Sequence, residues 1–175
     1  MLEQFVNEVL PKTQNSTAGA RQDEIEGKVL GRMPDTNEVS DRQELRGLVD
    51  RYAQSADRRD RPGFAAGFTV DGALVVGGGR EIKGREAIGK VLEHLETNYV
   101  RTMHFVGNHV VDFVGDGAQG ETYCIAHHIY SHDAGERDTS MFIRYIDSYT
   151  RTPEGWKMSR REVNIAWQED RPVAS

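Results

Sequence analysis

The chain has 175 residues, of which 37% are hydrophobic and 29% charged, and its formal net charge is −6. This length and composition indicate one globular domain with room for a tail. The negative charge and the lack of a Lys/Arg cluster exclude a nucleic-acid-binding face. No apolar run approaches the about 20 residues of a membrane span, and no signal peptide is recognisable, so we expect a cytoplasmic protein without nucleic-acid or membrane partners.

Residues 1–39 differ from the rest of the chain. A short amphipathic helix is expected over Leu2 to Leu10, before Pro11. The polar and charged residues that follow have no sustained apolar period, which favours an extension or linker. This segment could be an arm packed on a partner subunit or a disordered tail.

The domain is expected to begin at Ser40, where Ser40 and Gln43 form a capping-box pattern at a helix start. Asp57 extends the apolar face of this helix by one turn, which places a carboxylate near the core. The alternative is that Asp57 only pairs with Arg58 or Arg59 at the helix end. The apolar face consists of Leu45, Leu48, Val49, Tyr52, Ala53 and Ala56.

The next residues predict a second, shorter helix and a β-hairpin. Pro62 suits the first position of a short helix that carries Phe64, Ala65 and Phe68. Two strands, 73–76 and 80–83, flank a triple-glycine turn. Apolar residues then recur at helical spacing from Gly84 to Asn98, which predicts a third helix.

The rest of the chain is rich in β-strand patterns separated by short turns. Strands are expected over 102–113, 120–132, 139–151 and 156–167, with a charged loop at 133–138 and a loose tail at 169–175. Helices followed by a long meander indicate an α+β domain over 40–168. A curved antiparallel or mixed sheet wrapped around the N-terminal helices would form a cone with a small-molecule pocket.

Period-two alternation relates the side chains that share a face of each strand. If Cys124 points inward, so do Thr122 and His128, while His127 points outward. Each face then carries one histidine, and alternation alone does not identify the functional one. The single cysteine, Cys124, excludes an intramolecular disulfide and is interpreted as a small pocket or core residue.

His104 lies among apolar neighbours in the segment RTMHFVGNHVV. A histidine in that position is either a packed core residue or a proton-transfer group. The spacing alone favours the core residue.

The chain resembles the SnoaL-like branch of the nuclear-transport-factor-2-like superfamily in five segments: 45–60, 68–74, 83–88, 102–108 and 145–161. The resemblance covers about residues 40–168 and implies a cystatin-like cone. Members of this group include scytalone dehydratase, hexachlorocyclohexane dehydrochlorinase, bile-acid dehydratase, ketosteroid isomerase, polyketide cyclases and non-catalytic dioxygenase subunits. The resemblance therefore implies a small hydrophobic, aromatic or polycyclic ligand, no cofactor and no metal, and a homodimer or homotrimer.

The resemblance also assigns roles to individual residues. It implies that Asp57 orients His104, which removes a proton, and that Arg161 stabilises developing negative charge. A second catalytic histidine of scytalone dehydratase matches His128 better than His127, and His128 or Tyr52 could donate a proton to a leaving hydroxyl. The steroid-processing dehydratase has an acidic residue where this chain has His128, so the substrate class does not transfer.

Five further residues are expected to line the pocket: Tyr52, Phe68, Thr122, Cys124 and Val163. The resulting hypothesis is a cofactor-independent lyase or isomerase that acts on a hydrophobic cyclic compound with a general base. The alternative is a non-catalytic ligand-binding member or the β subunit of a ring-hydroxylating dioxygenase.

Other interpretations of the charged residues also stay open. Arg161 could form a structural ion pair with Glu162 or Asp147. Asp57 and the two histidines could form a metal site.

Overall fold

The computed structural model describes residues 36–173, which form three helices and six strands. Apolar residues recur about every 3.6 positions in the long helices and tend to alternate with polar ones in the strands. The predicted helix at 2–10 and most of the expected N-terminal extension lie outside the described residues. The elements, in chain order, are α3 (Thr36–Arg58), α4 (Arg61–Ala66), β1 (Phe68–Val76), β2 (Arg80–Lys83), α5 (Arg85–Asn98), β3 (Arg101–Val114), β4 (Gly117–His132), β5 (Gly135–Thr152) and β6 (Gly155–Pro172).

The apolar face of α3 is buried as its spacing predicts. Six side chains along it are no more than 7% exposed: Leu45, Leu48, Val49, Tyr52, Ala53 and Ala56. The predicted start at Ser40 is wrong, because the helix begins at Thr36 and Ser40 lies within it. An i,i+4 ion pair of 2.9 Å between Arg42 and Glu38 stabilises the additional turn.

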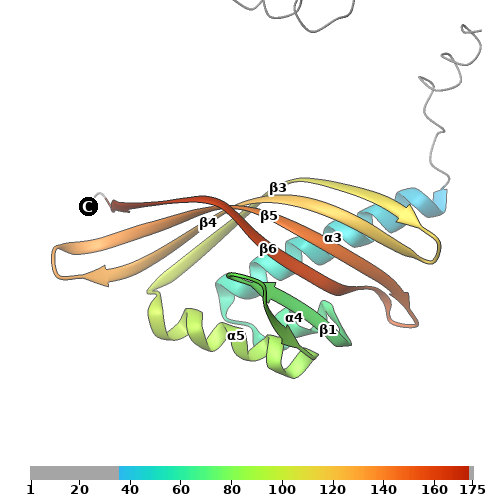
Figure 1. Ribbon diagram of the computed structural model, residues 1–175, viewed down its shortest axis with the longest axis horizontal. Helices are drawn as coiled ribbons and strands as arrows, with labels where there is room; N and C mark the ends of the chain where they lie inside the picture. The colour runs from blue at the N-terminus through green and yellow to red at the C-terminus, as the bar shows by residue number, and fades with distance from the viewer. Residues whose placement is uncertain (1–35, 174–175) are drawn as a thin grey trace, which may run out of the picture. The chain divides into compact units, whose positions relative to one another are not determined.

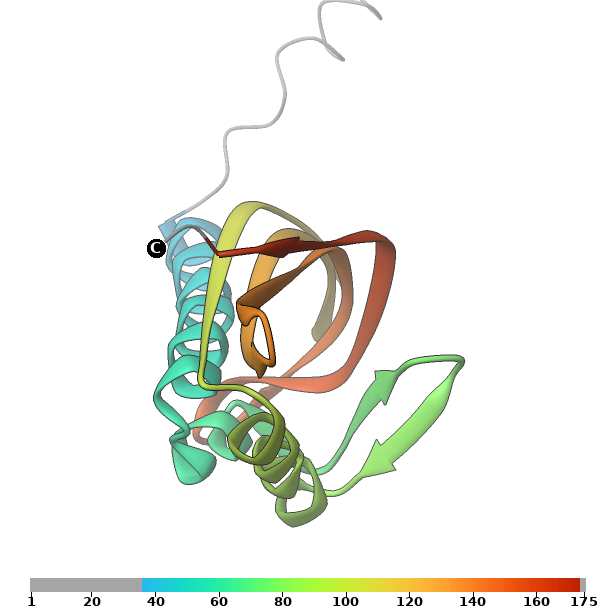
Figure 2. The ribbon, with the colours of Figure 1, turned by 90° about the vertical axis from the view of Figure 1, so that its left-hand side faces the viewer.

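The six strands form one sheet in the order β2-β1-β6-β5-β4-β3. Strands β3 to β6 are an antiparallel meander, whereas β1 pairs with β6 in parallel. The sheet curves strongly, and α3 lies along its concave side, with α5 near one end (Figures 1 and 2). The predicted α+β cone with a mixed sheet is therefore confirmed.

The sequence pattern predicts Phe68 in the second helix. In the structure it is the first residue of β1. The helix α4 ends at Ala66, with Gly67 as its C-cap. The register of β1 against β6 then shifts between Phe68 and Ala73. This irregularity interrupts the alternation of side chains, so only the regular stretch 73–76 has a recognisable strand pattern.

The long strands extend beyond their predicted ends. β5 begins at Gly135, inside the predicted loop 133–138, and β6 continues through the predicted tail as far as Pro172. Pairing partners explain both extensions, since Pro172 lies opposite Arg137. Asp170 also accepts hydrogen bonds from Tyr130 and Thr139. The tail from 169 onward is therefore ordered strand to Pro172, because neighbouring strands supply its contacts.

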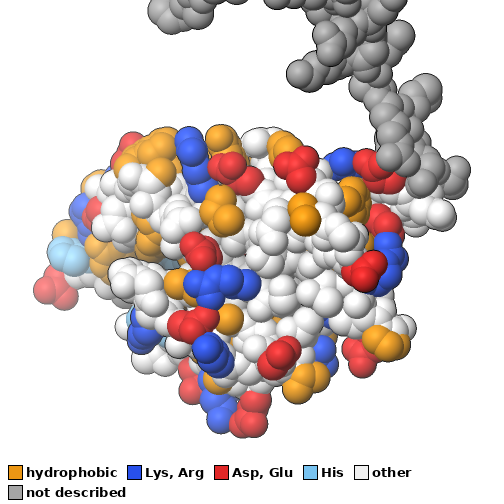
Figure 3. Space-filling model, turned by 45° about the vertical axis from the view of Figure 1, so that its right-hand side comes forward, with side chains coloured by type: hydrophobic (Ala, Val, Ile, Leu, Met, Phe, Trp, Pro, Cys, Tyr) orange, Lys and Arg blue, Asp and Glu red, His pale blue; other side chains and the backbone are white. Residues whose placement is uncertain are grey.

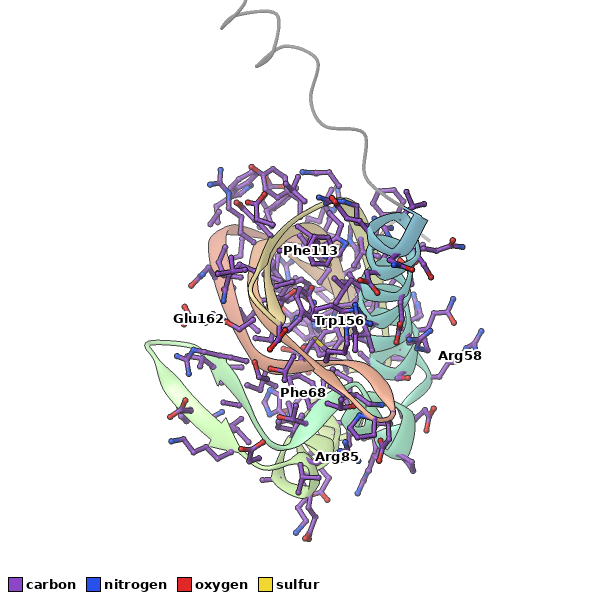
Figure 4. The ribbon with its side chains drawn as sticks, turned by 90° about the vertical axis from the view of Figure 1, so that its right-hand side faces the viewer. Arg58, Phe68, Arg85, Phe113, Trp156 and Glu162 are labelled. Carbon is purple, nitrogen blue, oxygen red and sulfur yellow. The ribbon has the colours of Figure 1, made fainter. Side chains whose placement is uncertain are left out.

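One hydrophobic core lies between the concave face of the sheet and the helices. Figure 4 shows Phe68, Phe113 and Trp156 within this space, whereas Arg58 and Glu162 project away from it. Phe68 and Trp156 are 0% and 2% exposed. The core therefore also forms the inner wall of the cone, where the predicted site residues are located.

The surface carries charges of both signs. Figure 3 shows acidic and basic side chains interspersed over one face of the molecule. In the part of the chain that the structure describes, no helix combines the length and hydrophobicity needed to cross a membrane.

Candidate functional site

The end of α3 places Asp57 against strand β3. Arg59, just beyond the helix, adopts a φ of 57°, which turns the chain sharply and leaves Asp57 in the last helical turn. The Asp57 carboxylate accepts hydrogen bonds from the Thr102 hydroxyl at 2.9 Å and from the His104 backbone N–H at 2.9 Å. The predicted alternative, in which Asp57 pairs with Arg58 or Arg59, is not what these contacts show.

The same carboxylate also contacts the imidazole ring of His104. Asp57 Oδ1 and His104 Nδ1 are 2.7 Å apart, and 8% of the His104 side chain is exposed. Burial acts to raise the pKa of Asp57, but hydrogen bonds from His104 and Thr102 outweigh it and lower that pKa. With the carboxylate ionised, Nδ1 carries the hydrogen and Nε2 has a free lone pair. The geometry therefore suits His104 Nε2 to accept a proton.

His128 lies beside this pair on the inner face of β4. The rings of His104 and His128 are 5.4 Å apart, and the His128 ring is 4.8 Å from Tyr99. His128 is 5% exposed, and its Nδ1 atom is buried without a hydrogen-bond partner. Burial and the nearby His104 lower the pKa of His128 to about 4. His128 is therefore neutral at pH 7 and can act there as a hydrogen-bonding group, not as a cationic acid.

This lowered pKa makes the stability of the fold depend on pH. Above the ordinary histidine pKa of 6.5, neither the folded nor the unfolded chain binds a proton at His128. Between pH 6.5 and about 4 only the unfolded chain does, so the free energy of unfolding decreases as the pH falls through this window. We expect His128 to contribute up to about 3 kcal/mol of this decrease.

Urea unfolding of His128→Gln at several pH values measures this contribution. The variant should lose much of the pH dependence between pH 6.5 and 4, whereas His132→Gln, at an exposed position, should retain it. Parallel pH curves for wild type and His128→Gln would contradict the assignment of a neutral buried imidazole.

Arg161 is 0% exposed and lies on the inner face of β6. Its Nε and Nη2 atoms each donate to Asp147, both at 2.7 Å, and its guanidinium lies 4.2 Å from the Tyr52 ring centroid. Burial acts to lower the pKa of Arg161, but the Asp147 carboxylate more than compensates and raises it. Of the two predicted ion pairs, the structure forms the one with Asp147, while Glu162 pairs with Arg160. Arg161 Nη1 is buried without a partner.

The five predicted lining residues all lie on the inner side of the sheet or on α3. Tyr52 and Phe68 pack together with ring centroids 6.2 Å apart, and Val163 packs against the core. Thr122 is 0% exposed and its hydroxyl has no hydrogen-bond partner. Burial raises the pKa of Cys124 to about 11, so this thiol is not an activated nucleophile.

Among the described residues, five buried side-chain polar atoms have no hydrogen-bond partner, and three of them share this interior. Thr122 Oγ1, His128 Nδ1 and Arg161 Nη1 all belong to inward-facing side chains of β4 or β6. Buried polar atoms usually have hydrogen-bond partners, so a group of unpartnered ones is characteristic of a site that receives a polar ligand or water.

Three residues around the predicted ones were not identified from the sequence: Thr102, Asp147 as a site residue, and Tyr149. Thr102 lies two positions before His104, on the same strand face, which is a signal that period two could have revealed. Tyr145, Asp147 and Tyr149 likewise recur at period two along β5, and all three are no more than 2% exposed. The period-two pattern indicates that these three side chains share one face of β5, but it does not indicate that this face is buried.

Four hollows among the described residues have volumes of about 330, 340, 340 and 680 Å³. None of these four is lined by Asp57, His104 or His128. The first lies on the outer face of the sheet, between Phe105 and Trp167.

The metal-site interpretation has no support in this geometry. The described residues contain no group of three or more His, Cys, Asp or Glu side chains placed to hold a metal ion. One oxygen of Asp57 is used by the His104 ring, and the other accepts from the His104 backbone.

A sequence profile of the SnoaL-like domain matches residues 37–162. The chain belongs to the SnoaL-like family. An uncharacterised protein of Mycobacterium tuberculosis (strain ATCC 25618 / H37Rv) is 31% identical to this SnoaL-like chain over an alignment of 139 residues, which covers 75% of this chain and 90% of that protein.

Solved structures of similar proteins extend the comparison. A candidate scytalone dehydratase from Novosphingobium aromaticivorans is 26% identical with a TM-score of 0.70, covering 82% of the SnoaL-like chain and 95% of its own. A type 2 hexachlorocyclohexane dehydrochlorinase is 19% identical with a TM-score of 0.73, covering 81% and 98%. An NTF2-like protein with a cystatin-like fold, also from N. aromaticivorans, is 23% identical with a TM-score of 0.59, covering 86% and 92%. The last two show the shared fold, and the predicted SnoaL-like relationship is confirmed by the profile match.

Proposed function

We propose that this protein is a cofactor-independent lyase or isomerase that uses His104 as a general base on a hydrophobic cyclic ketone. The observation that carries the proposal is the 2.7 Å contact between the Asp57 carboxylate and His104 Nδ1, which leaves Nε2 as the proton acceptor. The similarity to a candidate scytalone dehydratase supports the same class of reaction. Aromatic and apolar side chains around the site, such as Tyr52 and Phe68, suit a hydrophobic ligand.

The reaction begins when His104 Nε2 removes a proton from a carbon next to the substrate carbonyl. Asp57 stabilises the imidazolium that forms. In a dehydration, the electron pair of the broken C–H bond becomes the new C=C bond as the C–O bond to the hydroxyl breaks. The proton held by His104 then passes to the departing hydroxyl, which leaves as water. Isomerisation begins with the same proton removal and returns the proton to another carbon.

His128 and Arg161 have supporting roles in this scheme. His128, neutral because its pKa is lowered to about 4, does not supply the proton but hydrogen-bonds to the leaving hydroxyl. Arg161 Nη1, which has no partner within the protein, donates to the carbonyl oxygen as negative charge develops there. The protein therefore needs only one proton-transferring group.

Proton removal can be tested without knowing the leaving group. Cyclic ketones and hydroxy-ketones are incubated with the protein in D₂O, and exchange of the hydrogen next to the carbonyl is followed by NMR, together with product formation. His104→Gln should slow exchange by about 10²- to 10⁴-fold. The matched control is His127→Gln, because His127 Nδ1 makes an equivalent 2.7 Å contact with Asp138 on the outer face of the sheet. His127→Gln should exchange at the wild-type rate, and equal exchange in His104→Gln would contradict the proposal.

A non-catalytic, ligand-binding role is the second candidate. The low exposure of His104, 8% of its side chain, favours it, because a binding site can be more enclosed than one that must turn over. Micromolar binding of a cyclic ketone by wild-type protein, with no exchange or product across the panel, would establish this role.

A further inference from the structure

A line of four polar side chains crosses the interior of the cone from β3 to β6. His109 Nε2 lies 3.2 Å from the Tyr149 hydroxyl, and that hydroxyl donates to Asp147 Oδ2 at 2.7 Å. Asp147 in turn accepts both hydrogen bonds from Arg161. Tyr149 and Asp147 are 2% and 0% exposed, so these contacts form away from bulk water. The line ends at Arg161 Nη1, which has no partner.

The donors in this line have a fixed direction. An ionised Asp147 only accepts hydrogen bonds, so the Tyr149 O–H must point toward it. Burial and the Asp147 carboxylate raise the pKa of Tyr149, which keeps the hydroxyl protonated. The Tyr149 oxygen can then only accept from His109, which places a hydrogen on His109 Nε2. Each member therefore holds its neighbour in one orientation.

Two irregular features of the backbone allow this line to form. The register of β3 against β4 shifts between Val106 and His109, and this bulge turns His109 to the inner face that His104 also occupies. Gly120 provides the space next to the contact. A Cβ atom at Gly120 would lie 2.8 Å from Tyr149 Cε2 and 3.4 Å from His109 Nε2.

Three hydrogen bonds fix the carboxylate of Asp147, two from Arg161 and one from Tyr149. The ring centroids of Tyr52 and Tyr145 also lie 4.2 and 4.4 Å from the guanidinium. These ring contacts do not have the directionality of a hydrogen bond, whereas the Tyr149 hydroxyl holds the Asp147 carboxylate at one oxygen. Asp147 and Tyr149 both belong to β5, and the contact between Tyr149 and His109 links the pair to β3. The direction of Arg161 Nη1 therefore depends on Tyr149 and His109 as well as on Asp147.

We propose that Tyr149 and His109 are positioning residues that hold Arg161 Nη1 in the orientation needed to contact the substrate oxygen. The catalytic part of this inference rests on the proposed function, whereas the positioning of Arg161 does not. Arg161 acts on charge that develops during the reaction, so a loss of its orientation affects kcat more than KM.

The test uses Tyr149→Phe in the full chain, which removes one hydroxyl and keeps the ring. With ¹⁵N-labelled arginine, wild-type protein should show slowly exchanging Arg161 side-chain N–H signals, and Tyr149→Phe should speed their exchange by at least about fivefold. With a cyclic ketone or hydroxy-ketone that the wild-type protein converts, kcat of Tyr149→Phe should be about tenfold lower, while KM should change less than about twofold. The matched control is Tyr123→Phe, which removes a tyrosine hydroxyl from the outer face of β4 and should change neither measurement.

His109 gives a second and milder test of the same contact. His109→Gln keeps an N–H donor for the Tyr149 oxygen and should retain most of the Arg161 protection, whereas His109→Leu should lose it. This pair decides the question if Tyr149→Phe does not fold. Unchanged Arg161 exchange in Tyr149→Phe, or equal effects of the two His109 variants, would overturn the proposal. If wild-type protein turns over no ketone, the proposed function fails, and the exchange measurements still decide whether Arg161 is positioned in this way.

Discussion

Replacing Asp57 by asparagine should lower kcat by about 10²- to 10⁴-fold in the ketone assay, with little change in the fold. One oxygen of Asp57 accepts from the backbone N–H of His104, and the other contacts Nδ1 of the same residue. In Asp57→Asn, the oxygen is expected to keep the backbone contact, which directs the NH₂ group at His104 Nδ1. That group can only donate, so the hydrogen of the imidazole moves to Nε2 and the proton-accepting lone pair is lost from the side that faces the substrate.

The measurement is steady-state kinetics of Asp57→Asn, with ¹⁵N NMR of His104 to identify the protonated nitrogen. The matched control is Asp138→Asn, because Asp138 makes the corresponding contact with His127 on the outer face. It should retain wild-type kinetics. A decrease of less than about threefold for Asp57→Asn, with the hydrogen of His104 still on Nδ1, would show that Asp57 does not set the state of this ring.

Replacing Asp147 by asparagine should lower the free energy of unfolding by about 3–5 kcal/mol. Asp147 and Arg161 are both 0% exposed, so the substitution leaves the guanidinium buried without a counter-charge. The pair itself need not stabilise the fold relative to apolar residues, but a single buried charge is costly. The arginine cannot avoid this cost by losing its proton, because its pKa stays far above neutral pH.

Urea unfolding of three variants tests this expectation. Glu162→Gln removes an acid from the partly exposed pair with Arg160 and should cost less than about 1 kcal/mol. The double variant Asp147→Leu with Arg161→Met should recover a large part of the stability lost in Asp147→Asn, because it removes both charges. A loss below about 1 kcal/mol for Asp147→Asn would mean that water or a movement of Arg161 relieves the buried charge.

The chain contains two similar pairs of histidine and aspartate on opposite faces of one sheet. In each, the carboxylate oxygen and the imidazole Nδ1 are 2.7 Å apart. They differ in surroundings, since 31% of the His127 side chain is exposed and 8% of the His104 side chain. The carboxylates differ in the opposite sense, since 7% of the Asp138 side chain is exposed and 24% of the Asp57 side chain. His127 and Asp138 serve as controls because they reproduce the hydrogen bond with a more exposed imidazole on the other face of the sheet.

The sequence by itself determined the local elements of this protein and the order in which they occur. Apolar residues of α3 repeat every 3.6 positions, and glycine-rich turns separate the strands of the meander, so these features depend only on residues close together in the chain. The resemblance of five segments to the SnoaL-like family also identified Asp57 and His104 as candidates, which spacing alone could not do.

Only the tertiary structure decided which of these side chains lie together. His109 faces inward because a bulge in β3 changes the alternation, and a bulge depends on how a neighbouring strand pairs. Arg161 forms an ion pair with Asp147 and not with Glu162, because Asp147 lies on the buried face of the adjacent strand. Whether His128 or His127 points into the interior likewise depends on which face of β4 the helices cover. Contacts between residues distant in the chain determine these outcomes, and no local pattern of apolar and polar residues contains them.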